Sequence, residues 1–382
     1  MRYSRKNSIL SLGDSFLRTH QAPATISYMW NFGVYSLFFL AIQIITGLLL
    51  AMYYVPSPEQ AFNSVENIMR DVKYGWLLRY MHSNGASFFF IAVYIHIFRG
   101  LYYTSFVDKK RTVWYIGAII LLVMIITAFL GYVLPWGQIS YWGAMVITNF
   151  LSAVPVIGQS LVEWVWGGFS INATTLTRFY GLHFLLPFVI LLLSLLHVYY
   201  LHQAGHNNPV GTDSRAEPLA FFPYFISKDI LGLWIFVSIY LFFVFFYPNT
   251  LGHSDNYIPA NPLVTPAHIV PEWYFLPLYA ILRSIPNKLG GVLLLLFAII
   301  SILLLPLLFK TNLTSLSNRP LSRHLFFFFL TTCFFLGWVG GQPAQYPYTF
   351  VGAVATFCYF SYFYLFGPLF IYIENNAPGF KN

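Results

Sequence analysis

The stretch HSNGASFFFIAVYIH at residues 82–96 decides the fold, and HFLLPFVILLLSLLH at residues 183–197 repeats its pattern. Each stretch begins and ends with a histidine, fourteen residues apart (96 − 82 and 197 − 183). On an α-helix this step makes nearly four turns and about 21 Å of rise, so both histidines lie on almost the same face. Because a bilayer core is about 30 Å thick, we expect one histidine of each helix near each side of a membrane.

The composition is that of a membrane protein. Of the 382 residues, 58% are hydrophobic, 20% are aromatic and only 8% are charged, unlike a soluble globular chain. Eight apolar stretches are long enough to cross a bilayer, and in hydrocarbon such runs must be helical because their backbone has no water to bind. They cover residues 30–53, 76–104, 112–133, 177–203, 229–248, 289–309, 324–341 and 348–374. We therefore expect an all-α membrane protein with eight transmembrane helices.

The distribution of charge supports this topology. A net charge of +8 would indicate nucleic acid in a soluble protein, but here the basic residues lie in loops of a membrane bundle. An even number of crossings puts both termini and every second loop on one side, which carries fourteen of the 20 lysines and arginines. Both termini are thus predicted to face the electrically negative compartment. Cys333 and Cys358 fall inside apolar stretches, where each is expected to pack as a small hydrophobic residue.

The four histidines form two predicted pairs. A single transmembrane histidine is more often a packing residue or part of a proton path than a metal ligand. The second and fourth stretches run in the same direction, so as neighbours they would place His82 opposite His183 and His96 opposite His197. These are the first and second histidine pairs. Four histidines at matched spacing favour the ligation of two stacked haems.

Glycines repeat the same interval. Gly33 and Gly47 lie fourteen residues apart in the first stretch, as do Gly117 and Gly131 in the third. A porphyrin inside a helical bundle needs neighbouring backbones without side chains in its way. Because these helices run opposite to the histidine helices, Gly47 and Gly131 should flank the first histidine pair, and Gly33 and Gly117 the second. One such glycine pair could arise by chance, since glycine is common in membrane helices, but two pairs at the histidine spacing indicate a shared function.

Two arginines lie at the ends of the second stretch. Arg79 precedes His82 by one turn, and Arg99 follows His96 by three residues, so each could reach a haem propionate. An arginine extended toward the membrane interface is an equally good interpretation.

Three longer strings carry a family resemblance. They are GYVLPWGQISYWGAMVITN at 131–149, GHSDNYIPANP at 252–262 and PEWYFLPLYAILRSIPNKLGG at 271–291. Nearly end to end, the chain resembles the mitochondrial cytochrome b family, whose members are the core subunits of ubiquinol:cytochrome c reductase (respiratory complex III). The resemblance implies a low-potential haem at the first histidine pair, a high-potential haem at the second, quinol oxidation on the positive side and quinone reduction on the negative side.

The resemblance also implies a mechanism and partners. One electron from ubiquinol would pass to a high-potential partner, and the other would cross both haems to reduce quinone, coupled to proton translocation. The chain has no Cys-x-x-Cys-His motif and no iron–sulfur ligand set, so the high-potential acceptors must be other subunits. These would be a Rieske iron–sulfur protein and a cytochrome c-type subunit. Accessory subunits, membrane lipid and a homodimeric complex are expected, and nucleic acid is not.

Two units and a location follow from the same resemblance. Residues 1–210 would form an N-terminal dihaem domain from four helices, and residues 211–382 a C-terminal domain completing the quinol oxidation site. The compact length and the spacing from His183 to His197 favour the mitochondrial inner membrane, with both termini on the matrix side.

Glu272 is the candidate proton acceptor for quinol oxidation. It is the only carboxylate in the apolar stretch 268–282, where a carboxylate is costly unless it is used. Quinol oxidation releases protons, so we expect Glu272 to accept one, with a pKa raised by desolvation. A carboxylate that caps a helix or braces the loop is the alternative role. Tyr274 and Tyr132 offer hydroxyls nearby or anchor at the interface. By the resemblance, the apolar walls are Phe129, Gly143, Val146, Ile147, Phe275 and Tyr279.

His202, Lys228 and Asp229 are the candidates for quinone reduction. His202 follows His197 by five residues, which turns it about 140° away, so it is not a further haem ligand. A protonatable histidine with a carboxylate could supply the two quinone carbonyls with protons. Without the resemblance, solvated loop ends would be the preferred interpretation. Possible walls are Trp30, Asn31 and Ser36.

The chain departs from the family pattern at His206, where serine is expected, and in the loop GGFSINATTLTRF, which lacks the usual charged residue. Two other functions stay open on the residues alone. A transporter could use its histidines as a proton relay without cofactor. A simpler dihaem quinone oxidoreductase anchor would lack the bifurcating site.

Overall fold

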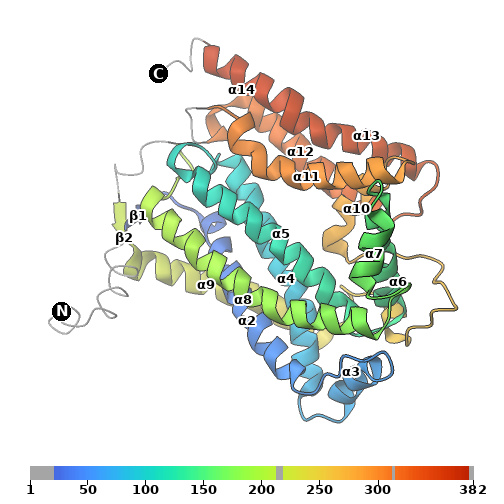
Figure 1. Ribbon diagram of the computed structural model, residues 1–382. Coiled ribbons are helices and arrows are strands. Elements are labelled where there is room, and N and C mark those ends of the chain that lie inside the picture. The colour runs from blue at the N-terminus through green and yellow to red at the C-terminus, as the bar shows by residue number, and fades with distance from the viewer. Residues whose placement is uncertain (1–20, 212–217, 312–314, 378–382) are drawn as a thin grey trace.

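The computed structural model describes residues 21–211, 218–311 and 315–377. Within these ranges eight helices are long and apolar enough to cross a membrane, which confirms the predicted number of spans (Figure 1). The spans run over Tyr28–Ala51, Gly75–Tyr102, Asp108–Val133, Ala173–Ala204, Phe221–Phe246, Lys288–Leu308, Pro320–Gly340 and Tyr348–Asn376. Each lies within eight residues of its predicted bounds at either end.

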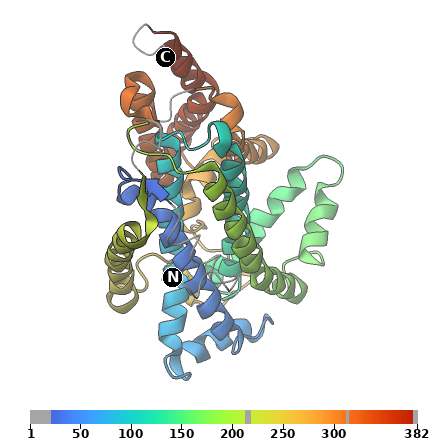
Figure 2. The same ribbon diagram turned by 90° about the vertical axis from the view of Figure 1, so that its left-hand side faces the viewer.

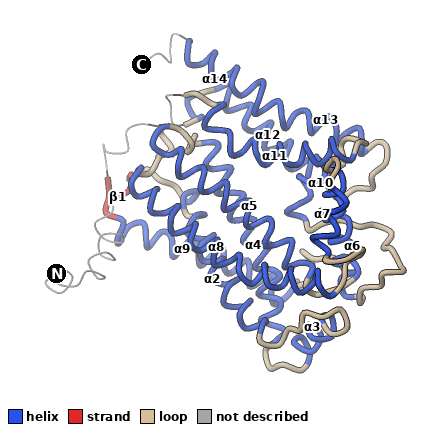
Figure 3. The backbone as a smooth tube through the Cα atoms, in the orientation of Figure 1, coloured by secondary structure: helices blue, strands red, loops and turns tan. Residues whose placement is uncertain are grey.

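The spans consist mainly of α2 (Phe32–Ala51), α4 (Gly75–Tyr102), α5 (Arg111–Val133), α8 (Ala173–Ala204), α9 (Ile226–Phe246), α11 (Lys288–Leu308) and α12 (Pro320–Gly340), with α13 (Tyr348–Ser361) and α14 (Gly367–Asn376) in the last. Shorter helices connect them: α3 (Ala61–Arg70), α6 (Gln138–Asn149), α7 (Gly158–Trp166) and α10 (Leu276–Leu282). Strands β1 (Gln21–Pro23) and β2 (Pro218–Ala220) pair antiparallel. Helices dominate the described chain (Figure 3).

The two histidine helices have different surroundings. α4 packs along α2, and α8 packs along α5, so the glycine helices flank the histidine helices. In its most apolar stretch 44% of α4 is buried inside the chain, against 6% of α8. α4 is therefore an inner helix, whereas α8 presents an apolar outer face, as expected for contact with lipid or another membrane subunit.

α8 also begins with a defined cap. The side chain of Asn172 accepts hydrogen bonds from the backbone N–H groups of Thr174 and Thr175, and Thr175 Oγ1 accepts from the Asn172 N–H. This reciprocal arrangement satisfies backbone donors that a helix start leaves without partners. The cap fixes where the helix begins, ten residues before His183.

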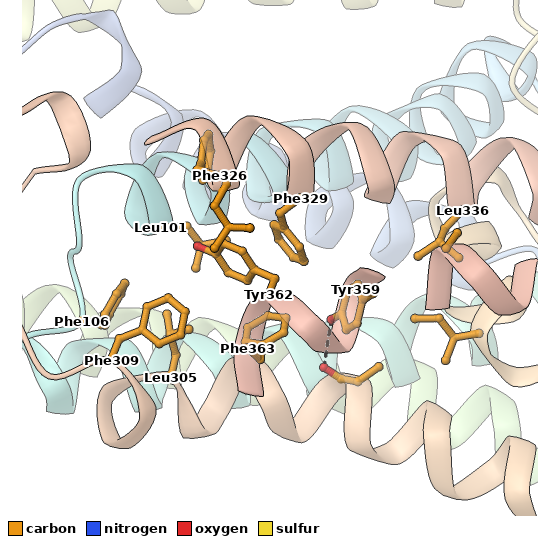
Figure 4. Packing of buried hydrophobic residues seen from close by; sticks show 14 of the residues in the cluster. Leu101, Phe106, Leu305, Phe309, Phe326, Phe329, Leu336, Tyr359, Tyr362 and Phe363 are labelled. Atoms are coloured by element: carbon orange, nitrogen blue, oxygen red, sulfur yellow. Dashed lines mark hydrogen bonds between the residues drawn. The ribbon is translucent and has the colours of Figure 1, made fainter. Parts of the chain in front are cut away.

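The C-terminal spans pack into a common aromatic cluster (Figure 4). Phe329 of α12 stacks on Tyr362 with ring centroids 4.1 Å apart, and the Tyr359 hydroxyl donates to the Ala298 carbonyl at 3.1 Å. Leu101, from the end of α4, belongs to the same cluster. Because lipid is as apolar as these side chains, close packing holds the helices together in a membrane where the hydrophobic effect would do so in water. It joins the C-terminal spans to the end of α4 that follows His96.

A buried charge cluster links α12 to the end of the chain. Glu374 of α14 accepts hydrogen bonds from the backbone N–H groups of Leu321 and Ser322 and from the Ser322 hydroxyl. Arg319 donates to the Asn375 side chain at 2.7 Å and lies 3.9 Å from the Glu374 carboxylate. Arg319 is 1% exposed and Glu374 2%. The carboxylate therefore caps the α12 N-terminus, where negative charge is favoured, and balances a buried cation.

The short helices α6 and α7 lie to one side of the long helices (Figure 2). Several hydrogen bonds fasten the loop after α9 to α6. Among them, the Ser140 N–H donates to the Asn256 side chain, the Gln138 side chain donates to the Val264 carbonyl, and the Asn261 N–H donates to the Gln138 side chain. These bonds hold α6 against the loop that leads to α10.

Candidate functional site

The first histidine pair lies between α4 and α8. The rings of His82 and His183 face each other with centroids 6.2 Å apart and planes 85° apart. Nδ1 of His183 lies 2.8 Å from the Thr127 carbonyl oxygen of α5. A carbonyl only accepts, so Nδ1 of His183 carries the proton and Nε2 keeps a lone pair for a metal.

His82 has a side-chain partner instead of a carbonyl. Its Nδ1 lies 2.9 Å from the hydroxyl oxygen of Thr46 on α2. That hydroxyl donates to the Ile42 carbonyl at 2.6 Å. Thr46 was not among the residues singled out from the sequence.

The second histidine pair repeats the spacing at the other end of the helices. The rings of His96 and His197 also have centroids 6.2 Å apart, with planes 60° apart. Nδ1 of His96 lies 3.2 Å from a guanidinium nitrogen of Arg99. Nδ1 of His197 faces the Val113 carbonyl but, within the part of the chain described, makes no hydrogen bond of standard geometry. The two pairs thus agree in spacing and differ in their supporting contacts.

Glycines stand against all four rings. A Cβ added at Gly131 would lie 2.3 Å from Cε1 of His183, and one at Gly117 would lie 3.1 Å from Cε1 of His197. The corresponding distances are 3.1 Å from Gly47 to His82 and 3.3 Å from Gly33 to His96. Gly47 and Gly131 therefore border the first histidine pair, and the other two border the second, as the sequence predicted.

The histidine pairs fit axial ligation of an iron porphyrin. With a metal–nitrogen bond of about 2 Å and roughly 1 Å from nitrogen to ring centre, two imidazoles on one iron would have centroids about 6 Å apart. Among the described residues no three His, Cys, Asp or Glu side chains converge into a ligand set. Two facing histidines alone leave the remaining metal positions to a macrocycle, and the glycines leave room for its plane.

A cavity of about 290 Å³ surrounds the first histidine pair. Both of its histidines, Gly47 and Gly131 line it, and so does Arg79. The cavity continues to Glu272 and Tyr132. Arg79 therefore lies where a propionate of a group held by the pair could be bound.

A second, smaller pocket adjoins this cavity and is called the Glu272 pocket. Glu272 and Tyr132 line both spaces, so they form the wall between them. The apolar residues expected from the sequence all line the Glu272 pocket: Phe129, Gly143, Val146, Ile147, Phe275 and Tyr279. The pocket combines a mostly apolar lining with one carboxyl, two phenols and the Ser140 hydroxyl, which suits a small amphipathic ring compound.

Glu272 lies just before the short helical turn Trp273–Phe275, but its side chain does not cap that turn. The alternative role as a helix cap is therefore not what the geometry favours. Burial raises the pKa of Glu272 to about 7, and the neighbouring Tyr132 hydroxyl and Arg79 guanidinium oppose this shift. The Tyr132 hydroxyl is buried and has no well-formed hydrogen bond among the described residues. A carboxyl poised near neutral pH can both take up and release a proton.

Tyr274 differs from its neighbours. It is 4% exposed, and its ring stacks on Phe90 of α4 with centroids 4.1 Å apart and planes 4° apart. Its carbonyl accepts a hydrogen bond from the Tyr94 hydroxyl. Tyr274 lines the cavity of the first histidine pair and is not among the residues lining the Glu272 pocket. These contacts anchor the segment that carries Glu272 to the inner helix.

At the opposite end, the first and fifth spans meet through polar contacts. Asn31 is 1% exposed and donates to the Lys228 carbonyl at 3.3 Å. The Lys228 ammonium donates to the carbonyls of Ile26 and Ser27 at 3.0 and 3.1 Å. Asp229 follows Lys228 at the start of α9. Lys228 thus braces the chain that enters the first span.

The other candidates at this end have separate contacts. The Arg99 guanidinium lies over the Trp30 ring, 5.3 Å from the ring centroid, and the Ser36 hydroxyl donates to the Phe32 carbonyl of its own helix. His202 lies near the end of α8. Its predicted convergence with Lys228 and Asp229 stays a prediction.

Comparisons with known proteins agree along the whole chain. Residues 17–205 match the family described as Cytochrome b/b6/petB, and residues 259–360 match Cytochrome b(C-terminal)/b6/petD. The chain belongs to the cytochrome b family. Cytochrome b of Chondrus crispus is 54% identical over 376 residues, covering 98% of this chain and 99% of that protein. Cytochrome b of Rickettsia bellii (strain RML369-C) is 54% identical, covering 94% and 90%.

A solved structure extends the agreement to three dimensions. A chain of a "Hyperthermophilic respiratory Complex III" is 33% identical, with a TM-score of 0.93 over 98% of this chain and 99% of that one. Membership of the cytochrome b family confirms the resemblance, the eight-span fold and a respiratory electron-transfer function. Members of the cytochrome b family bind haem b.

Proposed function

We propose that the chain, as the cytochrome b of a ubiquinol:cytochrome c reductase, holds two b-type haems. The first histidine pair would carry the low-potential haem and the second the high-potential haem. The observation that carries this proposal is the repeated geometry: two facing histidine pairs at 6.2 Å, each bordered by two glycines. When bound, the haems supply one-electron carriers at two depths of the membrane.

The chain supports these ligands differently at its two ends. At the first pair, the Thr46 and Thr127 contacts already leave Nε2 of both histidines free of a proton. At the second pair, Arg99 can only donate, so in its present position Nδ1 of His96 accepts. Ligation through Nε2 of His96 requires Arg99 to turn to another acceptor, and a propionate is the acceptor expected there. Arg79 would bind a propionate at the first pair.

Quinol oxidation is proposed at the Glu272 pocket. A quinol hydroxyl would donate its proton to Glu272, whose pKa of about 7 lets it accept and then release protons at the pH of use. The buried Tyr132 hydroxyl is available to bind the other ring oxygen. One electron would leave for a high-potential partner and the other toward the first histidine pair, because Glu272 and Tyr132 border both spaces. Tyr274 holds the segment in place.

Quinone reduction is proposed at the opposite end. His202 and Asp229 would donate protons to the two quinone oxygens, and Lys228, which already binds two carbonyls, would hold the wall formed with Asn31. Trp30 and Ser36 would complete the wall. Protons are then released on one side of the membrane and taken up on the other, which is the basis of proton translocation.

The proposed setting is the mitochondrial inner membrane, with both termini on the matrix side. The proposed partners are a Rieske iron–sulfur protein, a cytochrome c-type subunit and accessory subunits, within a homodimeric complex surrounded by lipid. The exposed apolar side of α8 supports contact with lipid or a second membrane subunit. The division into units 1–210 and 211–382 is retained as a proposal.

Reduced-minus-oxidised spectra of the purified complex test the haem proposal. Two b-type haems per chain are expected, whereas a transporter with a histidine proton relay would be colourless. Bifurcation is tested in the assembled complex with the reducing site inhibited. Unrestricted two-electron flow from quinol to cytochrome c would support the simpler dihaem anchor instead.

A further inference from the structure

Thr46 makes a side-chain contact that distinguishes His82 from the other three paired histidines. The Thr46 side chain is buried, and the residue as a whole is 2% exposed. Its hydroxyl oxygen lies 2.9 Å from Nδ1 of His82 and 2.6 Å from the Ile42 carbonyl oxygen, with the Gln43 carbonyl farther away at 3.4 Å. The hydroxyl therefore stands between a backbone acceptor and an imidazole nitrogen.

The direction of the two hydrogen bonds follows from this geometry. A hydroxyl has one proton and two lone pairs, while the Ile42 carbonyl can only accept. The Thr46 proton is thus used toward Ile42, and the oxygen accepts from an Nδ1–H of His82. This arrangement selects the tautomer of His82 in which Nε2 has a free lone pair.

Among the residues that the structure describes, the second histidine pair has no counterpart to this contact. Gly47 and Gly33 occupy equivalent positions fourteen residues apart, and the residue before Gly33 is Phe32 where Thr46 precedes Gly47. Nδ1 of His96 faces Arg99, a donor. The repeat of the glycines therefore does not extend to the hydroxyl.

We propose that Thr46 is a positioning residue that holds His82 in its Nδ1-protonated form and lowers the reduction potential of the haem at the first histidine pair. This inference rests on the proposed ligation of that haem by His82 and His183. Donation of a hydrogen bond from Nδ1–H makes the imidazole a more basic ligand at Nε2. A more basic axial ligand stabilises ferric over ferrous iron, so the potential falls.

The test is a redox titration of the purified complex carrying Thr46→Val, with haem content per chain measured first. Valine keeps the shape of threonine but cannot accept a hydrogen bond. We expect the one-electron equilibrium of one haem to shift about tenfold toward the reduced form, which corresponds to about +59 mV. The other haem in the same protein is the internal control and should not move. Thr46→Ser keeps the acceptor and should restore the original potential.

Thr356→Val is the matched control. The Thr356 hydroxyl donates to the Gly352 carbonyl four residues earlier at 2.7 Å, as Thr46 does to Ile42, but it lies in the last span. It should leave both potentials unchanged. A shift in T356V as large as in T46V, or equal potentials in T46V and the wild type, would overturn the inference.

The outcomes separate this inference from the proposed function. Two haems in T46V with unchanged potentials would refute the role of Thr46 and leave the ligation intact. Two b-type haems in a His82→Ala complex would refute the ligation itself. If T46V does not retain its haem, Thr46→Cys serves in its place, since a thiol is a weaker acceptor. Its titration must show an upward shift in the reduction potential of one haem. An unchanged potential counts against the proposal.

Discussion

The two ends of the histidine bundle have the same spacing but different chemistry. At the first histidine pair, acceptors from Thr46 and Thr127 meet both Nδ1 atoms, and a cavity continues from the histidines to Glu272. At the second, a guanidinium meets one Nδ1 and a backbone carbonyl faces the other. Repetition along the helices therefore sets the positions of the ligands, whereas single residues outside the repeat set their electronic environment.

The difference also extends to the two proposed quinone sites. The Glu272 pocket presents a carboxyl whose side chain makes no cap and whose pKa is raised to about 7 by burial. At the other end, Lys228 is bound to two backbone carbonyls. The proposed oxidising end thus offers a group that can exchange protons, and the proposed reducing end offers a polar wall held by hydrogen bonds.

Loss of a histidine ligand should produce the largest difference between the two ends of the bundle. His82→Ala is expected to remove the haem of the first histidine pair and leave that of the second, so haem content falls from about two to about one per chain. Difference spectra of the purified complex measure this. His324→Ala is the control, because the exposed His324 contacts only its own helix at Pro320 in the described chain. Loss of haem in H324A as well would mean that the H82A effect is general misfolding.

Glu272→Gln should affect only the oxidising end. Removal of the proton acceptor is expected to slow quinol oxidation about 100-fold or more. In the native chain the rate should rise with pH through about 7, as Glu272 ionises, and this rise should be absent in E272Q. Pre-steady-state reduction of the first haem over pH 5.5–8.5 provides the measurement. Glu59→Gln, a change of an exposed carboxylate, should keep the native profile.

Glu272 also links stability to pH. Burial raises its pKa in the folded chain above the ordinary value of 4.5, so the folded state holds the proton more tightly than the unfolded state. The free energy of unfolding is therefore expected to fall as pH rises from about 4.5 to about 7 and to level off above that. E272Q should lack this contribution. A thermal-unfolding series across this pH range measures the slope in both proteins, and a slope that persists in E272Q would contradict its assignment to Glu272.

Alanine substitutions of the glycines should also affect the two histidine pairs differently, with a smaller effect than the substitutions above. Gly131→Ala would place a Cβ 2.3 Å from His183, whereas Gly117→Ala would place one 3.1 Å from His197. Overpacking of this kind costs about 1–3 kcal/mol, and the tighter site should lie at the upper end. G131A should therefore lose haem from the first pair at lower temperature than G117A loses it from the second. Equal losses would show that the backbones relax equally at both ends.

Lys228→Met is expected to have the smallest effect. It removes the hydrogen bonds to the Ile26 and Ser27 carbonyls, which should cost about 1 kcal/mol at this half-buried position. The oxidation of the second haem by quinone should slow by severalfold, while quinol oxidation at the other end stays native. Single-turnover kinetics with each site inhibited in turn distinguish the two. An equal slowing of both reactions would mean that Lys228 stabilises the chain in general and has no specific role at the proposed reducing site.

The sequence predicted the long-range features of the molecule better than its local contacts. Eight spans, the pairing of the histidines and the partners of Gly47 and Gly131 followed from helix period and direction, which are insensitive to side-chain detail. Thr46 was missed because a threonine in an apolar helix is common, although its place before Gly47, where Phe32 precedes Gly33, was a readable signal. The surface helices α6 and α7 were missed because they are too short to cross a membrane.

Other contacts depend on how loops return to the bundle. Tyr274 packs on Phe90 and lines the histidine cavity, while its neighbour Glu272 lines both spaces, a separation that adjacent residues in a loop do not reveal. The Lys228 bonds to backbone carbonyls involve residues about two hundred positions earlier in the chain. Hydropathy carries no information on such contacts, because polar groups pair according to loop geometry.

The cap on α12 has a consequence for how the chain is made. Glu374, which caps the seventh span and balances Arg319, belongs to the last turns of the polypeptide. A chain that stops before residue 374 would insert seven complete spans yet carry an uncompensated cation between them, and breaking such a buried pair costs several kcal/mol. Packing of the seventh span thus depends on the turn that carries Glu374, so the last two spans can reach their stable arrangement only together.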